Sequence, residues 1–237
     1  DTYRSRLTDA RTALSKIRRG ARIFLGSACG EPQLLIKTLI DVADNLADTE
    51  IIHFLDVGIA SYTDEKFNQN FRHNALFIGS STRNAINEGR ADYTPIFLSE
   101  IPLLILRGSM HIDVALITVS PPDKNGYVSL GISVDVTLAA AKSADRVIAQ
   151  VNPRMPRVLG NCFLHVSEVD AFVEREEELL TILDFPEPEA SAAIARLVAN
   201  LIEDGATIQV GLGDCGASIL QALAEKNDLG VHTQYMT

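Results

Sequence analysis

The sequence of this chain repeats its own opening segment, and the repeat constrains the fold more than any other feature. Residues 17–40 read "IRRGARIFLGSACGEPQLLIKTLI", and residues 202–225 read "IEDGATIQVGLGDCGASILQALAE". Aligned without a gap at an offset of 185, the two segments are identical at six of 24 positions. Each predicts a helix that ends at a glycine, a short apolar strand, a glycine-containing turn and a new helix. Strand-turn-helix units generally look alike, but the common register of two glycines favours a duplicated half.

The repeat predicts two homologous α/β domains, at residues 1–185 and 190–237. The stretch between them, "LDFPEPEAS", has the prolines and acidic residues of a linker. The second domain has room only for a strand, a helix and a second strand, and two strands do not close a sheet. Two halves of equal length would need at least about 370 residues. We therefore expect the second domain to be truncated, and the chain to be a fragment or a piece that requires a missing part.

Apolar strands alternate with helices in the first domain, which predicts an α/β fold with a mostly parallel sheet flanked by helices. Strands are expected at residues 22–25, 51–55, 75–77, 114–119, 147–150 and 163–166. Helices are expected at residues 32–44, 82–88, 134–144 and 194–202. The six arginines of the first 22 residues are compatible with a transit segment. The helical spacing of Leu7, Ala10, Leu14 and Ile17 instead favours an amphipathic first helix.

Charge and cysteine content exclude several classes of function. A formal net charge of -10 argues against a nucleic-acid partner, although a few arginines and helix N-termini can hold a phosphorylated small ligand. We expect neither a membrane span, for which about 18 apolar residues are needed, nor a signal peptide. The cysteines Cys29, Cys162 and Cys215 form no CxxC pair, so we expect no disulfide framework and no metal site. Reduced thiols favour a cytoplasmic location.

The segment "GLGDCG" places Gly211, Gly213 and Gly216 in a GxGxxG arrangement between a predicted strand and a predicted helix. This pattern is typical of NAD-binding domains, which also need an acidic residue about 20 positions further on. Thr233 and Gln234 occupy that place, so the NAD interpretation loses its best support. The coarser inference remains that backbone N–H groups here favour a phosphate or a developing oxyanion.

Three polar loops follow predicted strands or precede a helix, at residues 120–126, 129–133 and 152–160. The last contains Arg154 and Arg157 between prolines. In an open α/β sheet, ligands bind outside the carboxyl ends of the strands, where such loops lie. Each loop taken alone is equally well explained as a plain connection.

Five stretches together resemble the acetyl-CoA hydrolase/acyl-CoA:carboxylate CoA-transferase family, which includes 4-hydroxybutyrate and acetate CoA-transferases. They are "GSACGEP", "FLSEIP", "SPPDKNGYVSLGISVD", "NPRMPR" and "HVSEVD", in this order. The resemblance spans residues 5–237 and corresponds to the N-terminal portion of the longer family members. It implies two similar α/β halves with an acyl-CoA site between them, and acyl-CoA and small carboxylates as ligands. Coenzyme A is then a substrate and no other cofactor is implied, and we expect a homo-oligomer or a need for the missing C-terminal half.

The resemblance also implies a chemistry. In the family a glutamate of an "HTE" segment attacks the acyl-CoA thioester and forms an acyl-glutamyl anhydride. The anhydride reacts with the CoA thiolate to give an enzyme-CoA thioester, which a carboxylate or water then resolves. Here the segment reads His232-Thr233-Gln234, so Gln234 holds the catalytic position. The substrate- and CoA-binding residues implied are Gly211, Gly213, Asp214, Cys215 and Gly216.

A glutamine has no anionic oxygen, and losing a covalent nucleophile typically costs at least about 10⁴-fold in rate. Three explanations of Gln234 stay open: an engineered Glu→Gln change, natural divergence, or a nucleophile elsewhere. The function predicted is thus a CoA-transferase or acetyl-CoA hydrolase. The alternatives are a catalytically impaired acyl-CoA-binding module of a larger protein and, with less support, an NAD-dependent oxidoreductase.

Other residues carry weaker hypotheses. Cys215 at a helix N-terminus could be a nucleophile, but a packing cysteine is the better interpretation. His232 and Gln234 share one face of a strand, so His232 could orient a ligand. Glu31 and Glu100 resemble acidic residues of the family and are expected to cap a helix or fix a loop. The stretch "EREEELL" predicts a solvated helix face, and the remaining histidines show no metal-ligand spacing.

Overall fold

The computed structural model describes residues 2–182, 189–211 and 215–233. The chain divides into two compact units, Asp1–Ile182 (unit 1) and Leu183–Thr237 (unit 2). The division falls at the start of the stretch predicted to be a linker. That unit 2 is a homologous second domain stays a prediction.

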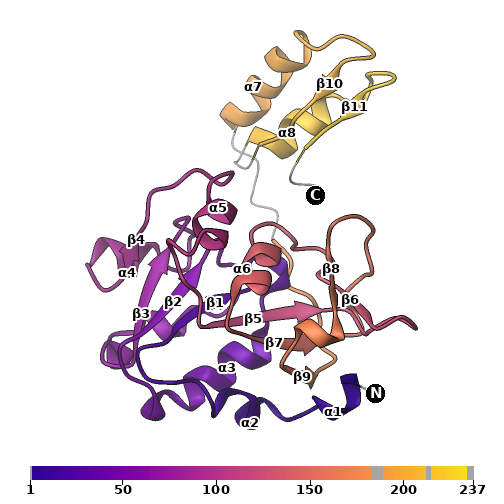
Figure 1. The fold of residues 1–237 in the computed structure, drawn as a ribbon. Coiled ribbons are helices and arrows are strands. Elements are labelled where there is room, and N and C mark those ends of the chain that lie inside the picture. The colour runs from indigo at the N-terminus through magenta and orange to yellow at the C-terminus, as the bar shows by residue number, and fades with distance from the viewer. Residues whose placement is uncertain (1, 183–188, 212–214, 234–237) are drawn as a thin grey trace. The chain divides into compact units, whose positions relative to one another are not determined.

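Unit 1 is built on a seven-stranded sheet in which every paired strand is parallel, with the order β4-β3-β2-β1-β5-β7-β9 (Figure 1). This confirms the predicted parallel α/β sheet. The strands are β1 (Arg22–Leu25), β2 (Thr49–His53), β3 (Phe71–Ala75), β4 (Asp92–Tyr93), β5 (Val114–Val119), β7 (Arg146–Val151) and β9 (Ala171–Glu174).

Helices cover both faces of this sheet, α2 and α3 on one and α5 and α6 on the other (Figure 1). Successive side chains of β1 serve the two faces, because Ile23 and Leu25 pack against α2 and α3 while Phe24 packs against α5 and α6. The helices are α1 (Thr2–Ser5), α2 (Ala10–Leu14), α3 (Gln33–Asp41), α4 (Arg83–Asn87), α5 (Ile101–Leu106) and α6 (Thr137–Ser143). Short 3-10 turns are η1 (Ala28–Gly30), η2 (Ala43–Asn45), η3 (Ser61–Thr63), η4 (Glu65–Phe67) and η5 (Val166–Glu168).

The predicted single first helix is wrong, because the chain forms α1 and α2 with a break at residues 6–9. Leu7 forms a parallel β-bridge with Phe172, and the Arg6 side chain donates to backbone carbonyls including that of Val169. Asp9 then starts α2 by accepting a hydrogen bond from the Thr12 N–H at 3.0 Å. Contacts with β9 and a local cap thus outweigh the helical periodicity.

Three other predictions need correction. The third strand lies at Phe71–Ala75 instead of 75–77, because its buried positions include His73 and its apolar pattern is therefore interrupted. The stretch "EREEELL" is not helical. Its first residue ends β9, and the side-chain amide of Asn152 donates a hydrogen bond to the backbone carbonyl of Glu177 at 2.8 Å. The strand near 163–166 exists as β8 (Phe163–His165), but it pairs antiparallel with β6 (Tyr127–Ser129) in a separate two-stranded sheet.

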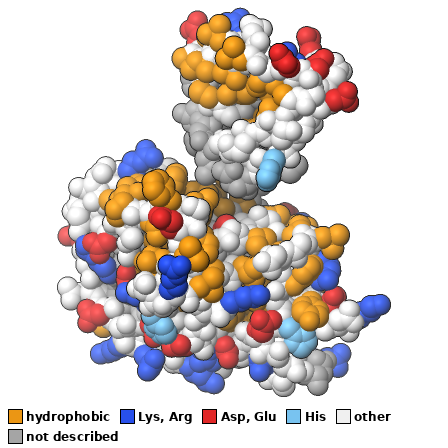
Figure 2. All heavy atoms as spheres, turned by 45° about the horizontal axis from the view of Figure 1, so that its top comes forward, with side chains coloured by type: hydrophobic (Ala, Val, Ile, Leu, Met, Phe, Trp, Pro, Cys, Tyr) orange, Lys and Arg blue, Asp and Glu red, His pale blue; other side chains and the backbone are white. Residues whose placement is uncertain are grey.

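Unit 2 contains α7 (Glu189–Ala199), β10 (Thr207–Ile208), α8 (Cys215–Ala222) and β11 (Gly230–Val231). The two strands are parallel, and α7 packs against α8. Hydrophobic side chains gather on its surface (Figure 2), where Leu197 and Leu201 are 69% and 83% exposed. Within the described parts of both units, no helix has the length and apolar character that crossing a membrane requires.

The N-terminal segment contributes to the core through Phe172. This side chain is fully buried, and its ring lies 4.8 Å from the ring of Tyr3. We expect Phe172→Ala to lower the free energy of unfolding by about 3–5 kcal/mol, because it removes a large buried ring and leaves a cavity. Phe97→Ala is the matched control: Phe97 is 77% exposed, so about 0.5 kcal/mol or less is expected. Urea unfolding of both variants measures the difference, and equal losses would contradict the packing of the N-terminal segment on β9.

Candidate functional site

The carboxyl ends of the parallel strands share one edge of the unit 1 sheet, and the loops that follow them gather there (Figure 1). Two loops dominate this edge: loop L1, residues 26–32 after β1, and loop L2, residues 54–60 after β2. The segments 120–126 and 152–160 follow β5 and β7. Ligands of open α/β sheets bind at this edge, so it is the candidate site in unit 1.

Loop L1 is bonded tightly to the segment before α6. The Ser27 hydroxyl donates to the Asp135 carboxylate, and the Gly30 N–H donates to Ser133 Oγ at 3.2 Å. A Cβ at Gly30 would lie 2.7 Å from the Ser133 Cβ, so only glycine fits this approach. Ala28 has φ 50°, a left-handed conformation that is strained for alanine. Such strain is concentrated at ligand-binding loops.

Glu31 joins loop L1 to loop L2. Its side chain is buried, and its carboxylate accepts from the Val57 N–H at 2.5 Å and from the Gly58 N–H at 3.1 and 3.0 Å. Burial raises the pKa of Glu31 to about 7, while the two backbone bonds act in the opposite direction. Glu31 therefore fixes a loop, as predicted from the sequence. Glu100 occupies the N-cap position of α5, but its side chain forms no cap hydrogen bond.

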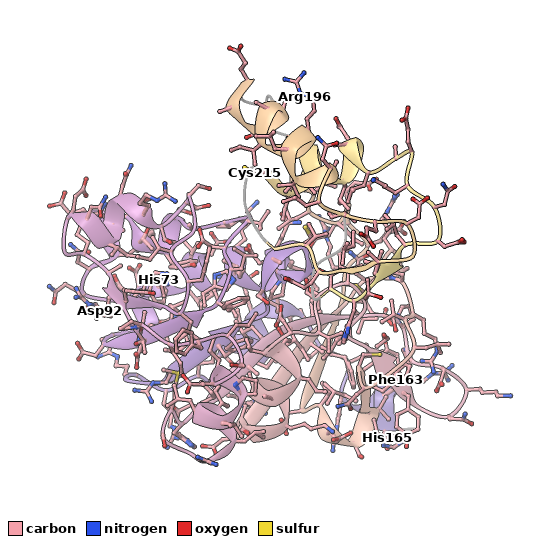
Figure 3. The ribbon with its side chains drawn as sticks, turned by 90° about the horizontal axis from the view of Figure 1, so that it is seen from above. His73, Asp92, Phe163, His165, Arg196 and Cys215 are labelled. Carbon is pink, nitrogen blue, oxygen red and sulfur yellow. The ribbon has the colours of Figure 1, made fainter. Side chains whose placement is uncertain are left out.

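A set of buried polar side chains lies beneath Glu31. His53 Nε2 is 3.7 Å from Glu31 Oε1, and His53 Nδ1 is 3.2 Å from the Tyr62 hydroxyl. Burial lowers the pKa of His53 to about 3 and that of His73 to about 4, so both rings are neutral at physiological pH. His73 lies on β3 beside Asp92 of β4 (Figure 3). Sequence reasoning missed this cluster, because its members are separated along the chain and only the sheet brings them together.

Loop 129–133 and loop 152–160 meet at Gly131. This glycine has φ 63°, and a Cβ on it would lie 2.1 Å from Met155 Sδ. The arginines of the second loop are already paired: Arg157 with Asp123 at 2.9 Å, and Arg154 with Glu178 at 2.7 Å. They are therefore neutralised by the protein's own carboxylates and are not arranged as an open anion site.

Arg157 also stacks over Phe163, with 4.4 Å between the guanidinium carbon and the ring centroid. Phe163 and His165 lie at the opposite end of unit 1 from His73 and Asp92 (Figure 3). This stacking holds loop 152–160 against β8, so the loop has a structural role.

The N-terminus of α3 is occupied by a side chain from β7. Gln150 Oε1 accepts from the N–H groups of Leu34 at 3.0 Å and Leu35 at 3.3 Å, which are otherwise available to an anion. The signal in the sequence is a single polar residue within the apolar strand "RVIAQV", which sequence reasoning did not use. The helix that follows loop L1 is thus closed to a phosphate.

Unit 2 holds the residues that the resemblance assigns to CoA binding. Cys215 is the first residue of α8 (Figure 3), and its thiol contacts Ser191 Oγ of α7 at 3.7 Å. This contact supports the packing role over the nucleophile. A Cβ at Gly216 would lie 3.1 Å from the carbonyl oxygen of Gly211, so helix and turn approach closely. The predicted residues Gly213, Asp214 and Gln234 lie outside the described residues.

A largely apolar cavity of about 500 Å³ adjoins these residues. Its lining includes Ile202, Val210, Gly211, Cys215, Gly216 and Leu223. Such a lining suits hydrocarbon and not phosphate, so any phosphate contact has to come from backbone N–H groups.

The segment that ends at Thr233 runs alongside the strand that precedes Gly211. His232 N–H donates to the Ile208 carbonyl at 2.9 Å, and the Thr233 hydroxyl donates to the Val210 carbonyl at 2.8 Å. The carboxyl ends of the parallel strands β10 and β11 are therefore adjacent.

One further cluster lies at the opposite, amino edge of the unit 1 sheet, where Asp113 and Asp145 precede β5 and β7. Ligand atoms of His111, Asp113 and Asp145 lie within 4.8 Å of one another. Sequence spacing did not indicate this cluster, because Asp145 is far along the chain from His111 and Asp113 and only the sheet brings them together. Asp113 already accepts from the Arg22 N–H at 2.7 Å and lies 3.6 Å from Arg18, so a surface ion-pair network explains it.

The contact between Gly30 and Ser133 gives a test of loop L1. We expect Gly30→Ala to lower the free energy of unfolding by about 1–3 kcal/mol, because the new methyl group overlaps the Ser133 Cβ. Adding Ser133→Gly should restore part of the loss, whereas adding Ser133→Ala should not, since alanine keeps the Cβ. Urea unfolding of the single and double variants measures this, and equal stability of the two double variants would contradict the geometry.

The buried histidines predict a pH dependence. The pKa values of His53 and His73 are lowered, so their contribution to stability is present above about pH 6.5 and is lost as pH falls through about 4 and 3. We expect His73→Phe, which removes one of these groups, to reduce the slope of stability against pH between pH 6.5 and 4.5 by about 1.4 kcal/mol per unit. Urea unfolding at several pH values measures the slope. The exposed His111→Phe is the control, and an unchanged slope in His73→Phe would contradict the neutral, buried ring.

Comparison with known proteins places these features in context. Residues 1–184 match the family model described as "Acetyl-CoA hydrolase/transferase N-terminal domain". The 4-hydroxybutyrate coenzyme A transferase of Clostridium kluyveri is 44% identical over 237 residues, covering 100% of this chain and 55% of that protein. The succinyl-CoA:acetate/propanoyl-CoA:succinate CoA transferase of Fasciola hepatica is 41% identical over 221 residues, covering 92% and 46%.

Solved structures agree with the sequence matches. RipA from Yersinia pestis superposes with a TM-score of 0.92 at 32% identity, over 99% of this chain and 57% of that one. The 4-hydroxybutyrate CoA-transferase from Porphyromonas gingivalis gives 0.81 at 29% identity, over 98% and 55%. The chain thus spans about half the length of the curated relatives and solved structures it matches.

Proposed function

The chain belongs to the acetyl-CoA hydrolase/transferase family, and from this premise we propose that it is the N-terminal portion of an acyl-CoA:carboxylate CoA-transferase or acetyl-CoA hydrolase. Its ligands would be acyl-CoA and small carboxylates. The family match over residues 1–184 is the observation that carries the proposal. The exposed apolar side chains of α7 and the turn after it, such as Leu197 and Leu201, add support for a further part of the protein that covers them.

The reaction proposed for the intact protein proceeds through two covalent intermediates. A glutamate carboxylate attacks the thioester carbonyl and expels CoA thiolate, which leaves an acyl-glutamyl anhydride. The thiolate then attacks the glutamyl carbonyl and expels the acyl carboxylate, so that an enzyme-CoA thioester remains. An acceptor carboxylate, or water, resolves this thioester. Backbone N–H groups of the segment from Gly211 to Gly216 are assigned to stabilise the oxyanion.

Gln234 stands at the position of the nucleophile in this scheme. Gln234 itself lies outside the described residues, and the Thr233 hydroxyl next to it in the sequence donates to the Val210 carbonyl at 2.8 Å. The amide has nearly the shape of a carboxylate but no anionic oxygen, so ligand binding is retained while anhydride formation is not. This substitution favours the second candidate function, a catalytically impaired acyl-CoA-binding module.

Restoring the carboxylate separates the two candidates. In the full-length protein, we expect Gln234→Glu to raise acetyl-CoA/acetate exchange by at least about 10⁴-fold, because it supplies the missing nucleophile. Isotope exchange between labelled acetate and acetyl-CoA measures the rate, and borohydride or hydroxylamine sensitivity of the enzyme reports the thioester. Gln221→Glu, an exposed change of the same charge on α8, is the control. No gain in Gln234→Glu would remove residue 234 from the catalytic position.

Ligand-dependent stability tests the binding function separately. We expect coenzyme A and acetyl-CoA to raise the melting temperature of the full-length protein, and NAD to leave it unchanged, because only ligands of the folded state stabilise it. A thermal-shift titration with the three compounds measures this. Stabilisation by NAD alone would replace the proposal with the oxidoreductase alternative.

A further inference from the structure

The repeat assigns loop L1 a counterpart in unit 2. At the offset of 185, Gly26 corresponds to Gly211 and Glu31 corresponds to Gly216, so loop L1 is the first copy of the segment proposed to bind CoA. The copies differ where each meets its helix. In unit 2 the carbonyl oxygen of Gly211 lies only 3.1 Å from the place that a Cβ on Gly216 would take. In unit 1 the same position is Glu31, whose long acidic side chain extends from loop L1 to loop L2.

Glu31 is anchored on the far side by two backbone N–H groups of loop L2. The three oxygen–nitrogen distances are 2.5, 3.1 and 3.0 Å, to Val57 and Gly58. A Cβ on Gly58 would lie 2.5 Å from Glu31 Oε2, so loop L2 approaches the carboxylate as closely as glycine allows. A second bond from the Ala28 N–H to the Leu55 carbonyl, at 2.7 Å, joins the same two loops.

Buried polar groups continue below the carboxylate. The His53 ring stands between Glu31 and the Tyr62 hydroxyl, at 3.7 and 3.2 Å, and Tyr62 is 1% exposed. Because the ring is neutral, one of its nitrogens carries a proton and the other accepts one. A Tyr62 hydroxyl that donates to Nδ1 leaves the Nε2 proton facing Glu31. At 3.7 Å from Glu31 Oε1, Nε2 is beyond hydrogen-bond distance, so the carboxylate is held by loop L2 and lies over the buried ring.

We propose that Glu31 is a positioning residue for the acyl-CoA chemistry of the intact protein: its buried carboxylate ties loop L1 to loop L2 and holds the strained turn at Ala28 at the carboxyl ends of the unit 1 strands. This inference rests on the proposed function, and it assigns Glu31 no contact with the reacting atoms. Glu31 is 3% exposed and its oxygens are occupied by backbone N–H groups, so it cannot act as the nucleophile. Its effect passes through the geometry of the two loops.

Ionisation of Glu31 changes this arrangement without being required for it, because Oε1 alone accepts from both Val57 and Gly58. The anion accepts all the N–H contacts, whereas a protonated carboxyl turns one oxygen into a donor facing an N–H group. Burial raises the pKa of Glu31 to about 7, so the folded state favours the protonated carboxyl, and ionisation of Glu31 costs stability as pH rises from about 4.5 through about 7. The groups facing it are Cys29 of its own loop, Asp56 of loop L2, His53 of β2 and Tyr62 of η3, with His73 of β3 behind them. The two histidines stay neutral and the pKa of Tyr62 is raised well above its ordinary value. None of these three groups therefore titrates near pH 7.

The test uses the full-length protein with Gln234→Glu as the active parent. Into it we introduce Glu31→Gln, which keeps size and removes charge, and Glu100→Gln as the matched control on an exposed glutamate without a cap bond. We expect Glu31→Gln to lower kcat/KM for acyl-CoA at least about 10-fold, since small displacements of a positioned group have large kinetic effects. The Kd of free CoA should change less than about twofold. The limb of the pH–kcat/KM profile near pH 7 should disappear.

Amide hydrogen exchange supplies a direct readout of the tie. The amides of Val57 and Gly58 should exchange at least about 10-fold faster in Glu31→Gln than in Glu100→Gln, because their acceptor is weakened. If Glu31→Gln does not fold, Glu31→Asp, which keeps the charge but is one methylene shorter, is measured in its place. Faster exchange with kcat/KM equal to the Glu100→Gln control would overturn the proposal. A parent that neither exchanges acyl groups nor binds CoA would instead refute the proposed function.

Discussion

Burial of the parallel sheet on both faces is the constraint on which the rest of unit 1 depends. Every residue of β5 is buried, and the side chains of β1 alternate between two separate hydrophobic clusters. A sheet covered in this way has no free face for a ligand, so polar chemistry is confined to its edges. The carboxyl edge collects loops L1 and L2, and the amino edge collects surface ion pairs such as that of Arg18 with Asp113.

Several polar groups at the carboxyl edge are buried, and three of them form hydrogen bonds with partners from other segments. Gln150 closes the N-terminus of α3, Glu31 accepts two N–H groups of loop L2, and Ser27 is bonded to Asp135. Leaving any of these unpaired would cost about 1–3 kcal/mol per group. The edge is therefore preorganised by internal hydrogen bonds before any ligand arrives, and the strain at Ala28 is held by its neighbours.

The sequence predicts the fold well where a strand is uniformly apolar and poorly where tertiary contacts decide. β1 and β5 lie where the apolar runs place them, because strands buried on both faces leave a continuous signal. The apolar pattern misplaces β3 because His73 is buried within it, and the first helix is broken because Leu7 pairs with Phe172, far along the chain. Glycines and prolines indicate the loops of the candidate site. The His53–Glu31 pair leaves no such signal, since no local pattern reports a contact between a strand and a loop that are distant in the sequence.

The predicted repeat relates two turns, one in each unit, that carry different residues where each turn meets its helix. In the predicted duplication, the two turns share a sequence pattern, and the residue at the helix junction of each turn decides its role. Gly216 leaves the turn open for close backbone approach, whereas Glu31 converts the equivalent position into an anchor. In the proposed function, a glutamine at position 234 likewise separates two roles, ligand binding and covalent chemistry. Removing a nucleophile raises the barrier of the covalent step by about 5 kcal/mol or more, yet most of the contact surface of a ligand as long as acyl-CoA lies away from that atom. In the proposed function, binding and chemistry are carried by different parts of the molecule, and one can change without the other.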